Sequence, residues 1–146
     1  MKRYFKTFVF AILTGVIMSK IIYGQYNTKI VSNNVSKAYF FEVFVSSDLK
    51  KMTELMSNYN SYIYIKKNDK YYAYIGITFD NYEKVQSYFD NMGYKTKVVE
   101  LNISDEFKSR LKEYDMKLKN TDNTFDIKKI LSDILKCYEE LNHDKD

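Results

Sequence analysis

Apolar residues along the chain follow two periods in turn. Residues 38–46 are rich in aromatic and β-branched side chains, which is typical of a strand, and Ser46, Ser47 and Asp48 then offer an N-cap for a helix. The next apolar residues have the i, i+3, i+6, i+7, i+10 spacing of one buried helix face. They are Leu49, Met52, Leu55, Met56 and Tyr59. This segment therefore predicts a strand followed by a helix.

The same pattern returns 33 residues further along. Residues 71–78 have the character of a strand, and Asp80 offers a cap for the helix that follows. The repeated helix positions are Tyr82, Val85, Tyr88, Phe89 and Met92. A further strand follows each helix, at 62–66 and at 95–100, and Asn68-Asp69 supplies a turn between the two halves. The predicted order is strand, helix, strand, taken twice.

Two such units joined by a hairpin predict an α+β domain of the ferredoxin-like, split βαβ kind. We expect a four-stranded antiparallel sheet with two helices on one face and with the first and third strands in the centre. Lysines on edge strands discourage pairing with other chains. The expected edge strands carry Lys66, Lys67, Lys95 and Lys97. Among charged residues, the central pair carries only Glu42.

Side-chain alternation in the strands predicts what the uncovered sheet face presents. If Val43, Ile63 and Ala73 point toward the helices, their sequence neighbours point the other way. These candidate ligand-binding residues are Phe40, Glu42, Phe44, Tyr62, Tyr64, Tyr72 and Tyr74. Flat rings of this kind can stack on sugar rings, and the phenol and carboxylate groups can hydrogen-bond their hydroxyls. Nucleobases could stack on the same rings.

The N-terminal residues 1–24 have the pattern of a membrane anchor. Lys2, Arg3 and Lys6 precede an apolar run, and the 20 residues from Tyr4 to Tyr23 are about the length that crosses a bilayer. The basic start places the N-terminus in the cytoplasm and the domain outside it, where it does not meet RNA. A cleaved signal peptide and a buried helix of a soluble protein are the alternatives. Residues 25–37 are polar and predict a linker.

The C-terminal residues 102–146 predict a helical hairpin. One amphipathic helix is expected from Ser104 to Asn120 and a second from about Thr124 to Leu141. Their apolar stripes need a partner surface. They could pack across the aromatic sheet face, against each other, or against another protein.

Composition and charge exclude several classes of function. The net charge of +4 comes from residues 1–30, which hold five basic and no acidic groups, so the domain has no nucleic-acid-binding charge. Cys137 is the only cysteine and His143 the only histidine, and the four glycines form no phosphate-binding loop. We therefore expect neither catalysis nor a cofactor or metal ion.

Residues 71–94 resemble the second half of a SPOR domain, the sporulation-related repeat. Gly76 and Gly93 fall where that family has a strand ending in Val-Gly and a Gly after the second helix. The first half departs from the family at Glu42 and Phe44, where a Gln and a Gly are usual. The resemblance covers residues 38–101. It implies a ferredoxin-like fold on anchored envelope proteins, with the open sheet face binding the glycan strands of peptidoglycan.

Two function hypotheses follow. The first is a non-catalytic, peptidoglycan-binding module of the bacterial cell envelope, held by a single-pass anchor. The second is an envelope scaffold or assembly protein that docks another protein through the sheet face or the C-terminal hairpin.

Overall fold

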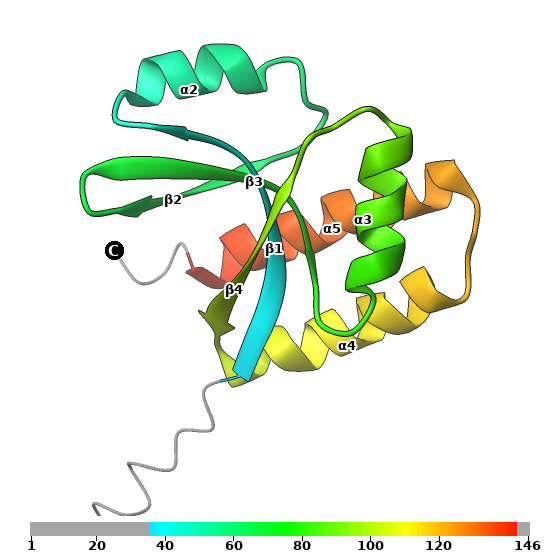
Figure 1. The fold of residues 1–146 in the computed structure, drawn as a ribbon. Coiled ribbons are helices and arrows are strands. Elements are labelled where there is room, and N and C mark those ends of the chain that lie inside the picture. Colours follow the sequence, from blue (N-terminus) through cyan, green and yellow to red (C-terminus); the bar gives the residue numbers. More distant parts are fainter. Residues whose placement is uncertain (1–35, 143–146) are drawn as a thin grey trace, which may run out of the picture. The chain divides into compact units, whose positions relative to one another are not determined.

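The computed structural model describes residues 36–142 as an α+β domain of four strands and four helices (Figure 1). The predicted anchor, almost all of the predicted linker and His143 lie outside the described residues. In chain order the elements are β1 (Ser36–Ser46), α2 (Leu49–Met56), β2 (Ile63–Lys67), β3 (Lys70–Thr78), α3 (Tyr82–Asn91), β4 (Lys97–Ile103), α4 (Asp105–Lys119) and α5 (Thr124–Asn142). None of the helices between residues 36 and 142 is both long enough and apolar enough to cross a bilayer.

The strands form one antiparallel sheet in the order β2-β3-β1-β4. The first and third strands are therefore central, as the pattern predicts. The pairing of β1 with β4 is regular from Ser36 opposite Ile103 to Glu42 opposite Lys97. The pairing of β1 with β3 shifts register on both sides of Glu42. An irregularity of this kind changes which side chains of a strand face the same way.

The β2–β3 hairpin joins the two halves through the turn that the sequence predicts. Asn68 and Asp69 have φ angles of 50° and 56°. Short polar side chains tolerate this left-handed conformation, and two such residues in succession match the twist of the flanking strands. The hairpin therefore needs no glycine here.

Local chemistry sets the ends of α2 and α3. Asp48 caps α2, accepting hydrogen bonds from the backbone N–H of Lys50 at 2.9 Å and of Lys51 at 3.4 Å. The N-cap of α3 is Asn81, one residue after the predicted Asp80. Gly93 follows α3 with a φ of 77°, and the Tyr94 N–H donates to the Phe89 carbonyl at 2.9 Å. This left-handed ending favours glycine.

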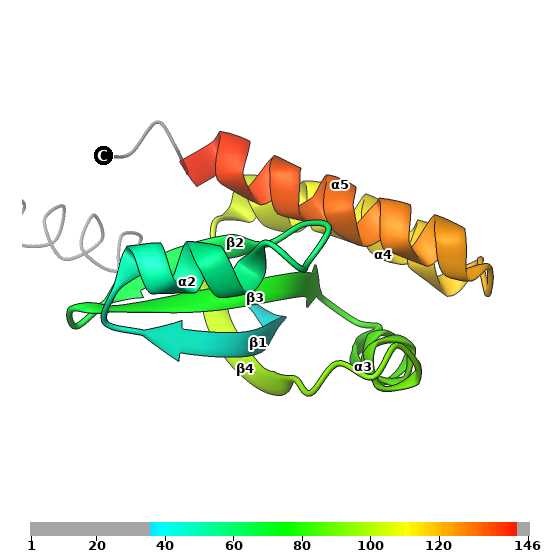
Figure 2. The ribbon, with the colours of Figure 1, turned by 90° about the horizontal axis from the view of Figure 1, so that it is seen from above.

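The sheet lies between helices on both sides. Figure 2 shows α4 and α5 along one face and α3 on the opposite face. Adjacent residues of β1 point to these two layers: the Phe40 ring contacts Tyr138 of α5, and the Phe41 ring contacts Phe89 of α3. The C-terminal hairpin thus packs on the sheet face that alternation left uncovered. Two of the three alternatives for its apolar stripes occur together, because α5 packs against β3 and also against α4.

Candidate functional site

The seven candidate residues do not share one sheet face. Tyr74 pairs with Ile63 and Tyr72 with Ile65, whereas Tyr64 pairs with Ala73 and so points to the other side. Phe44 also pairs with Ala73. The register shift at Glu42 explains why simple alternation along β1 fails. One extra residue in a ladder moves every later side chain to the opposite face, and amino-acid composition carries no mark of it.

The central rings of the expected open face are buried under α5. Phe40 is inaccessible to solvent, and its ring centroid lies 5.4 Å from that of Tyr74 and 5.4 Å from that of Tyr138, in edge-to-face contacts. Phe107 of α4 adds a further edge-to-face contact with Tyr138, at 5.0 Å. Burial, followed by the nearby Glu42 carboxylate, raises the pKa of Tyr74 to about 12. These rings form core, and no sugar could stack on them without removing the helix.

The remaining candidates are scattered. Glu42 is nearly buried, and its Oε1 lies 3.9 Å from the Lys97 Nζ. Tyr62 precedes β2 and lines a hollow beside Leu135 and Lys136 of α5. Tyr64 alone among the seven is well exposed, at 48%.

A small aromatic cluster stands at the exposed end of β2 and β3. The Tyr64 and Tyr71 rings lie 5.9 Å apart in an edge-to-face contact, and the Lys66 Nζ lies 5.8 Å from the Tyr71 ring centre. The cluster combines ring faces, phenol groups and a cation. It contains one of the predicted site residues and lies away from the buried Phe40.

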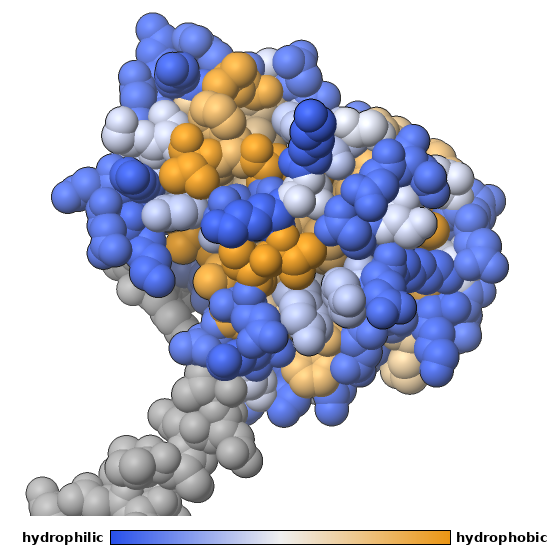
Figure 3. Space-filling view, viewed as in Figure 1, coloured by the Kyte–Doolittle hydropathy of each residue, from blue (hydrophilic) through white to orange (hydrophobic). Residues whose placement is uncertain are grey.

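An apolar groove lies between α2 and the loop after α3, over the second half of β1. We call it the α2 groove. Its volume is about 290 Å³. It is lined by Val43, Phe44, Leu55, Met56, Asn58, Tyr59 and Tyr94. Figure 3 shows apolar side chains gathered on this side of the molecule, over α2, β1 and β4. Leu55 is 42% exposed, although its helical spacing predicts burial.

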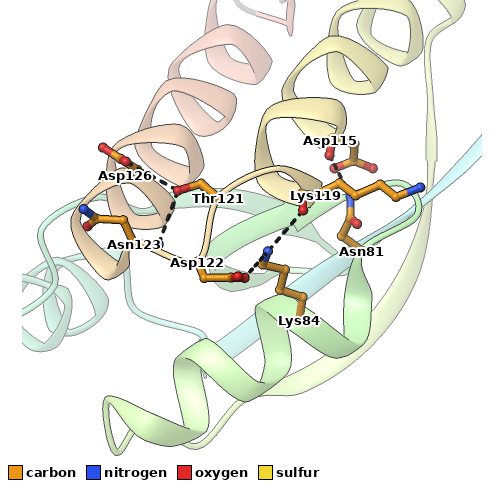
Figure 4. Close-up of polar contacts among 8 residues, drawn as sticks. All are labelled: Asn81, Lys84, Asp115, Lys119, Thr121, Asp122, Asn123 and Asp126. Atoms are coloured by element: carbon orange, nitrogen blue, oxygen red, sulfur yellow. Dashed lines mark hydrogen bonds and ion pairs between the residues drawn. The ribbon is translucent and has the colours of Figure 1, made fainter.

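A buried carboxylate holds the turn between β3 and α3. Asp115 of α4 accepts hydrogen bonds at 2.7 Å from the Thr78 hydroxyl and from the backbone N–H groups of Phe79 and Asp80. The Asn81 side chain donates to the Asp115 carbonyl at 2.9 Å (Figure 4). Burial raises the pKa of the Asp115 carboxyl despite these hydrogen bonds, which lower it. Asp115 is not among the residues predicted from the sequence, where its only signal is a charge beside the apolar stripe of α4.

A second contact ties α3 to the turn between α4 and α5. The Lys84 Nζ lies 2.8 Å from the Asp122 Oδ1 and 3.4 Å from the Lys119 carbonyl oxygen (Figure 4). Asp122 is fully exposed, and its pKa is lowered by the hydrogen bond from Lys84. Together with Asp115, this contact makes the corner between α3, α4 and α5 a structural junction.

The described residues offer little for catalysis or metal binding. Between residues 36 and 142, no three His, Cys, Asp or Glu side chains come close enough to hold a metal ion. Cys137 is buried, and this burial raises the pKa of its thiol, which makes the thiolate scarce at neutral pH. Asp115 is occupied by its hydrogen bonds. Among the described residues, the α2 groove and the Tyr64–Tyr71 pair present apolar and aromatic side chains to solvent.

In comparisons with known proteins, the chain matches no family model, no curated protein and no solved structure. The resemblance to SPOR domains therefore rests on the residues quoted for it above.

Proposed function

We propose that the chain is a non-catalytic docking module of the bacterial cell envelope, which binds another protein through the α2 groove and is held at the membrane by residues 1–24. This is the scaffold hypothesis of the sequence analysis, moved from the sheet face to a surface that solvent reaches. A single observation carries it: α5 covers Phe40 and Tyr74. The sheet face expected to bind glycan is therefore part of the core, and the α2 groove remains exposed to solvent.

The α2 groove supports protein docking by its chemistry. Its lining is formed by apolar and aromatic side chains with Asn58 at its border, and Leu55 projects into solvent beside it. Aromatic and methionine side chains are enriched where proteins bind one another. An exposed apolar surface of this kind on a folded domain is typical of an interaction site.

The same strand order supports a fold assignment within this proposal. We propose that β1 to β4 with α2 and α3 form a ferredoxin-like unit, and that α4 and α5 are an addition that closes its open face. The order β2-β3-β1-β4 and the duplicated strand-and-helix pattern support this assignment.

Photo-crosslinking of the full-length chain in its native cells tests the docking proposal. We expect a benzophenone side chain at Asn58, which lines the groove, to give one defined adduct with an envelope protein. We further expect Leu55→Asp to abolish the adduct, because a carboxylate in the contact would be desolvated.

The matched control carries the benzophenone at Lys129, an exposed position of α5 outside the α2 groove. An adduct formed equally from Lys129, or one that survives Leu55→Asp, contradicts docking in the groove. Because Leu55 is exposed, Leu55→Asp should leave the circular dichroism spectrum and the melting temperature of the domain close to those of the wild type.

Glycan binding is a second candidate, favoured by the exposed Tyr64 and Tyr71 rings with Lys66 beside them. A pull-down with purified sacculi, with and without amidase treatment, tests it. Glycan binding requires that the full-length protein sediment with sacculi and that Tyr64→Ala release it. If the protein stays in the supernatant in both cases, glycan binding is contradicted and the docking proposal is the one that remains.

A further inference from the structure

One face of α4 carries lysines at regular helical spacing. Lys108, Lys112, Met116 and Lys119 stand at i, i+4, i+8 and i+11, so they form a single stripe along the helix. Met116 is 60% exposed. We call this set the α4 stripe.

An aromatic ring lies against the stripe. Phe79, in the turn after β3, has the Lys108 Nζ at 5.7 Å and the Lys112 Nζ at 5.5 Å from its ring centre. The two ammonium groups stand over an apolar ring, with Met116 next along the helix. Phe79 is half buried, so Met116 is the exposed apolar side chain of the stripe. Lysines beside exposed apolar side chains are found on helices that rest on a membrane surface.

The charge of these lysines is available to a partner. Among the described residues, no carboxylate lies within ion-pair distance of Lys108, Lys112 or Lys119. Two nearby carboxylates are already engaged, since Asp115 accepts hydrogen bonds from the β3–α3 turn and Asp122 pairs with Lys84. The stripe therefore presents positive charge that the fold itself does not neutralise.

The stripe belongs to the helix beside which the chain enters the domain. Ser36, the first described residue, pairs with Ile103, and α4 begins two residues later at Asp105. Figure 1 shows β1 starting beside the first turn of α4. α2 lies beyond the opposite end of β1. The first turn of α4 and the first described residue thus lie at the same end of β1, and α2 follows its other end.

We infer that the α4 stripe rests on a bilayer containing anionic lipids, with the lysines at the phosphate groups and with Phe79 and Met116 in the interface. The lipid contact lies apart from the α2 groove, and the inference rests on the proposed function only through its membrane anchor. Each lysine near an anionic surface strengthens the contact about fivefold, so three lysines together strengthen it about 100-fold.

The experiment uses the full-length chain in lipid nanodiscs with an environment-sensitive fluorophore at residue 116, introduced as Met116→Cys on a Cys137→Ala background. The bilayers are phosphatidylcholine alone or phosphatidylcholine with phosphatidylglycerol. We expect a blue-shifted emission, and quenching by brominated lipid, only in the anionic bilayer. Raising the salt from about 0.05 M to about 0.5 M should reverse both effects.

Charge variants decide whether the stripe is responsible. The triple change Lys108→Glu, Lys112→Glu and Lys119→Glu should abolish the shift, and the neutral change of the same lysines to Gln should do so without reversing charge. A matched control changes Lys50, Lys51 and Lys67, which lie on α2 and β2, to Glu, and should leave the shift intact. A wild-type shift from both stripe variants, or equal emission in the two bilayers, overturns the inference.

The anchor and the stripe fail in different ways. Loss of the anchor shows as failure of the chain to co-sediment with neutral vesicles, whereas the fluorophore at residue 116 reports the stripe only in nanodiscs that contain anionic lipid. Failure of protein docking affects neither readout, because no partner protein is present.

Discussion

The two halves of the duplicated unit close their strand-to-helix turns by different means. In the first half the cap is local, since Asp48 accepts from the backbone N–H groups of Lys50 and Lys51. In the second half the turn after Thr78 is held by Asp115 of α4, which lies three elements further along the chain than β3. The same strand-to-helix turn is therefore stabilised by adjacent residues in the first half and by a residue of the C-terminal hairpin in the second. The turn of the first half is closed by residues next to it, whereas the turn of the second half adds contacts from α4 to its local bond between the Asn81 N–H and the Thr78 hydroxyl.

Burial differs between the halves in the same way. Met52 and Met56 of α2 are buried, and so are their counterparts Val85 and Phe89 of α3. The next pair differs, because Leu55 is 42% exposed whereas its counterpart Tyr88 is only 9% exposed. Tyr88 lines a hollow together with Leu131 of α5, so the added hairpin shields this flank of the second half. The corresponding flank of the first half is the α2 groove.

The largest effect should come from cutting the long-range cap. Asp115→Ala leaves the Thr78 hydroxyl and the amides of Phe79 and Asp80 without their acceptor, and we expect a loss of about 4 kcal/mol in the free energy of unfolding. Asp48→Ala removes an ordinary helix cap and should cost about 1 kcal/mol. Urea denaturation of both variants measures the difference. Equal losses of unfolding free energy in the two variants would mean that the local cap and the long-range contact stabilise their turns to the same extent.

A smaller difference in stability is expected between variants at Tyr88, on the flank of the second half, and at Leu55, on the flank of the first half. Tyr88→Ala empties a site that α5 helps to cover, and we expect it to lower the free energy of unfolding by about 3 kcal/mol. Leu55→Ala removes a side chain that solvent already reaches, and it should cost about 0.5 kcal/mol. Thermal and urea unfolding of the matched pair test this. A Leu55→Ala cost close to that of Tyr88→Ala would mean that the α2 groove is closed in solution.

The smallest effect concerns pH. Because the pKa of Asp115 is raised in the native state, this carboxyl takes up its proton in the folded chain before it does in the unfolded chain. Its titration therefore favours folding at pH values below the ordinary carboxyl pKa, and this contribution is lost as the pH rises through the raised pKa. The stability difference between the wild type and Asp115→Asn should be larger at pH 3 than at pH 7.

Urea titrations of the two proteins at both pH values measure this change. A difference that grows toward pH 7 would mean that the hydrogen bonds from Thr78 and the Phe79 and Asp80 amides outweigh the cost of burial.

Periodicity could predict the elements but not the layers. The spacing of apolar residues located both helices of the duplicated unit, because positions such as Met52 and Val85 must face the sheet in any arrangement. It also predicted β1 and β3 as the central strands. Periodicity could not predict where the C-terminal hairpin packs. An amphipathic stripe indicates that one helix face is buried, but it does not identify the surface that buries it. The aromatic residues that suggested a binding face, above all Phe40, are the ones the hairpin buries.

The candidate site was harder to predict for two physical reasons. The register shift at Glu42 reverses the side chains that follow it, so Phe44 lies on the face opposite to Phe40. The exposure of Leu55 depends on which segments pack beside α2, and helical spacing alone does not show this. Gly76 shows the same limit: a Cβ there would stand 2.9 Å from the Phe89 ring, a contact that no local pattern contains.

The order in which the chain is synthesised gives the hairpin a further role. β1 is the first strand of the domain to be made, yet both strands that pair with it and the ring that covers Phe40 come later, and Tyr138 belongs to the last helix. Until α5 is complete, a strand rich in phenylalanine has an uncovered face, and such surfaces aggregate. The pairing of β1 with β4 also spans most of the domain, and contacts so distant in sequence form slowly. A chain cut before α5 should therefore be a target for chaperones and proteases, and completion of the final helix marks the point at which the domain is finished.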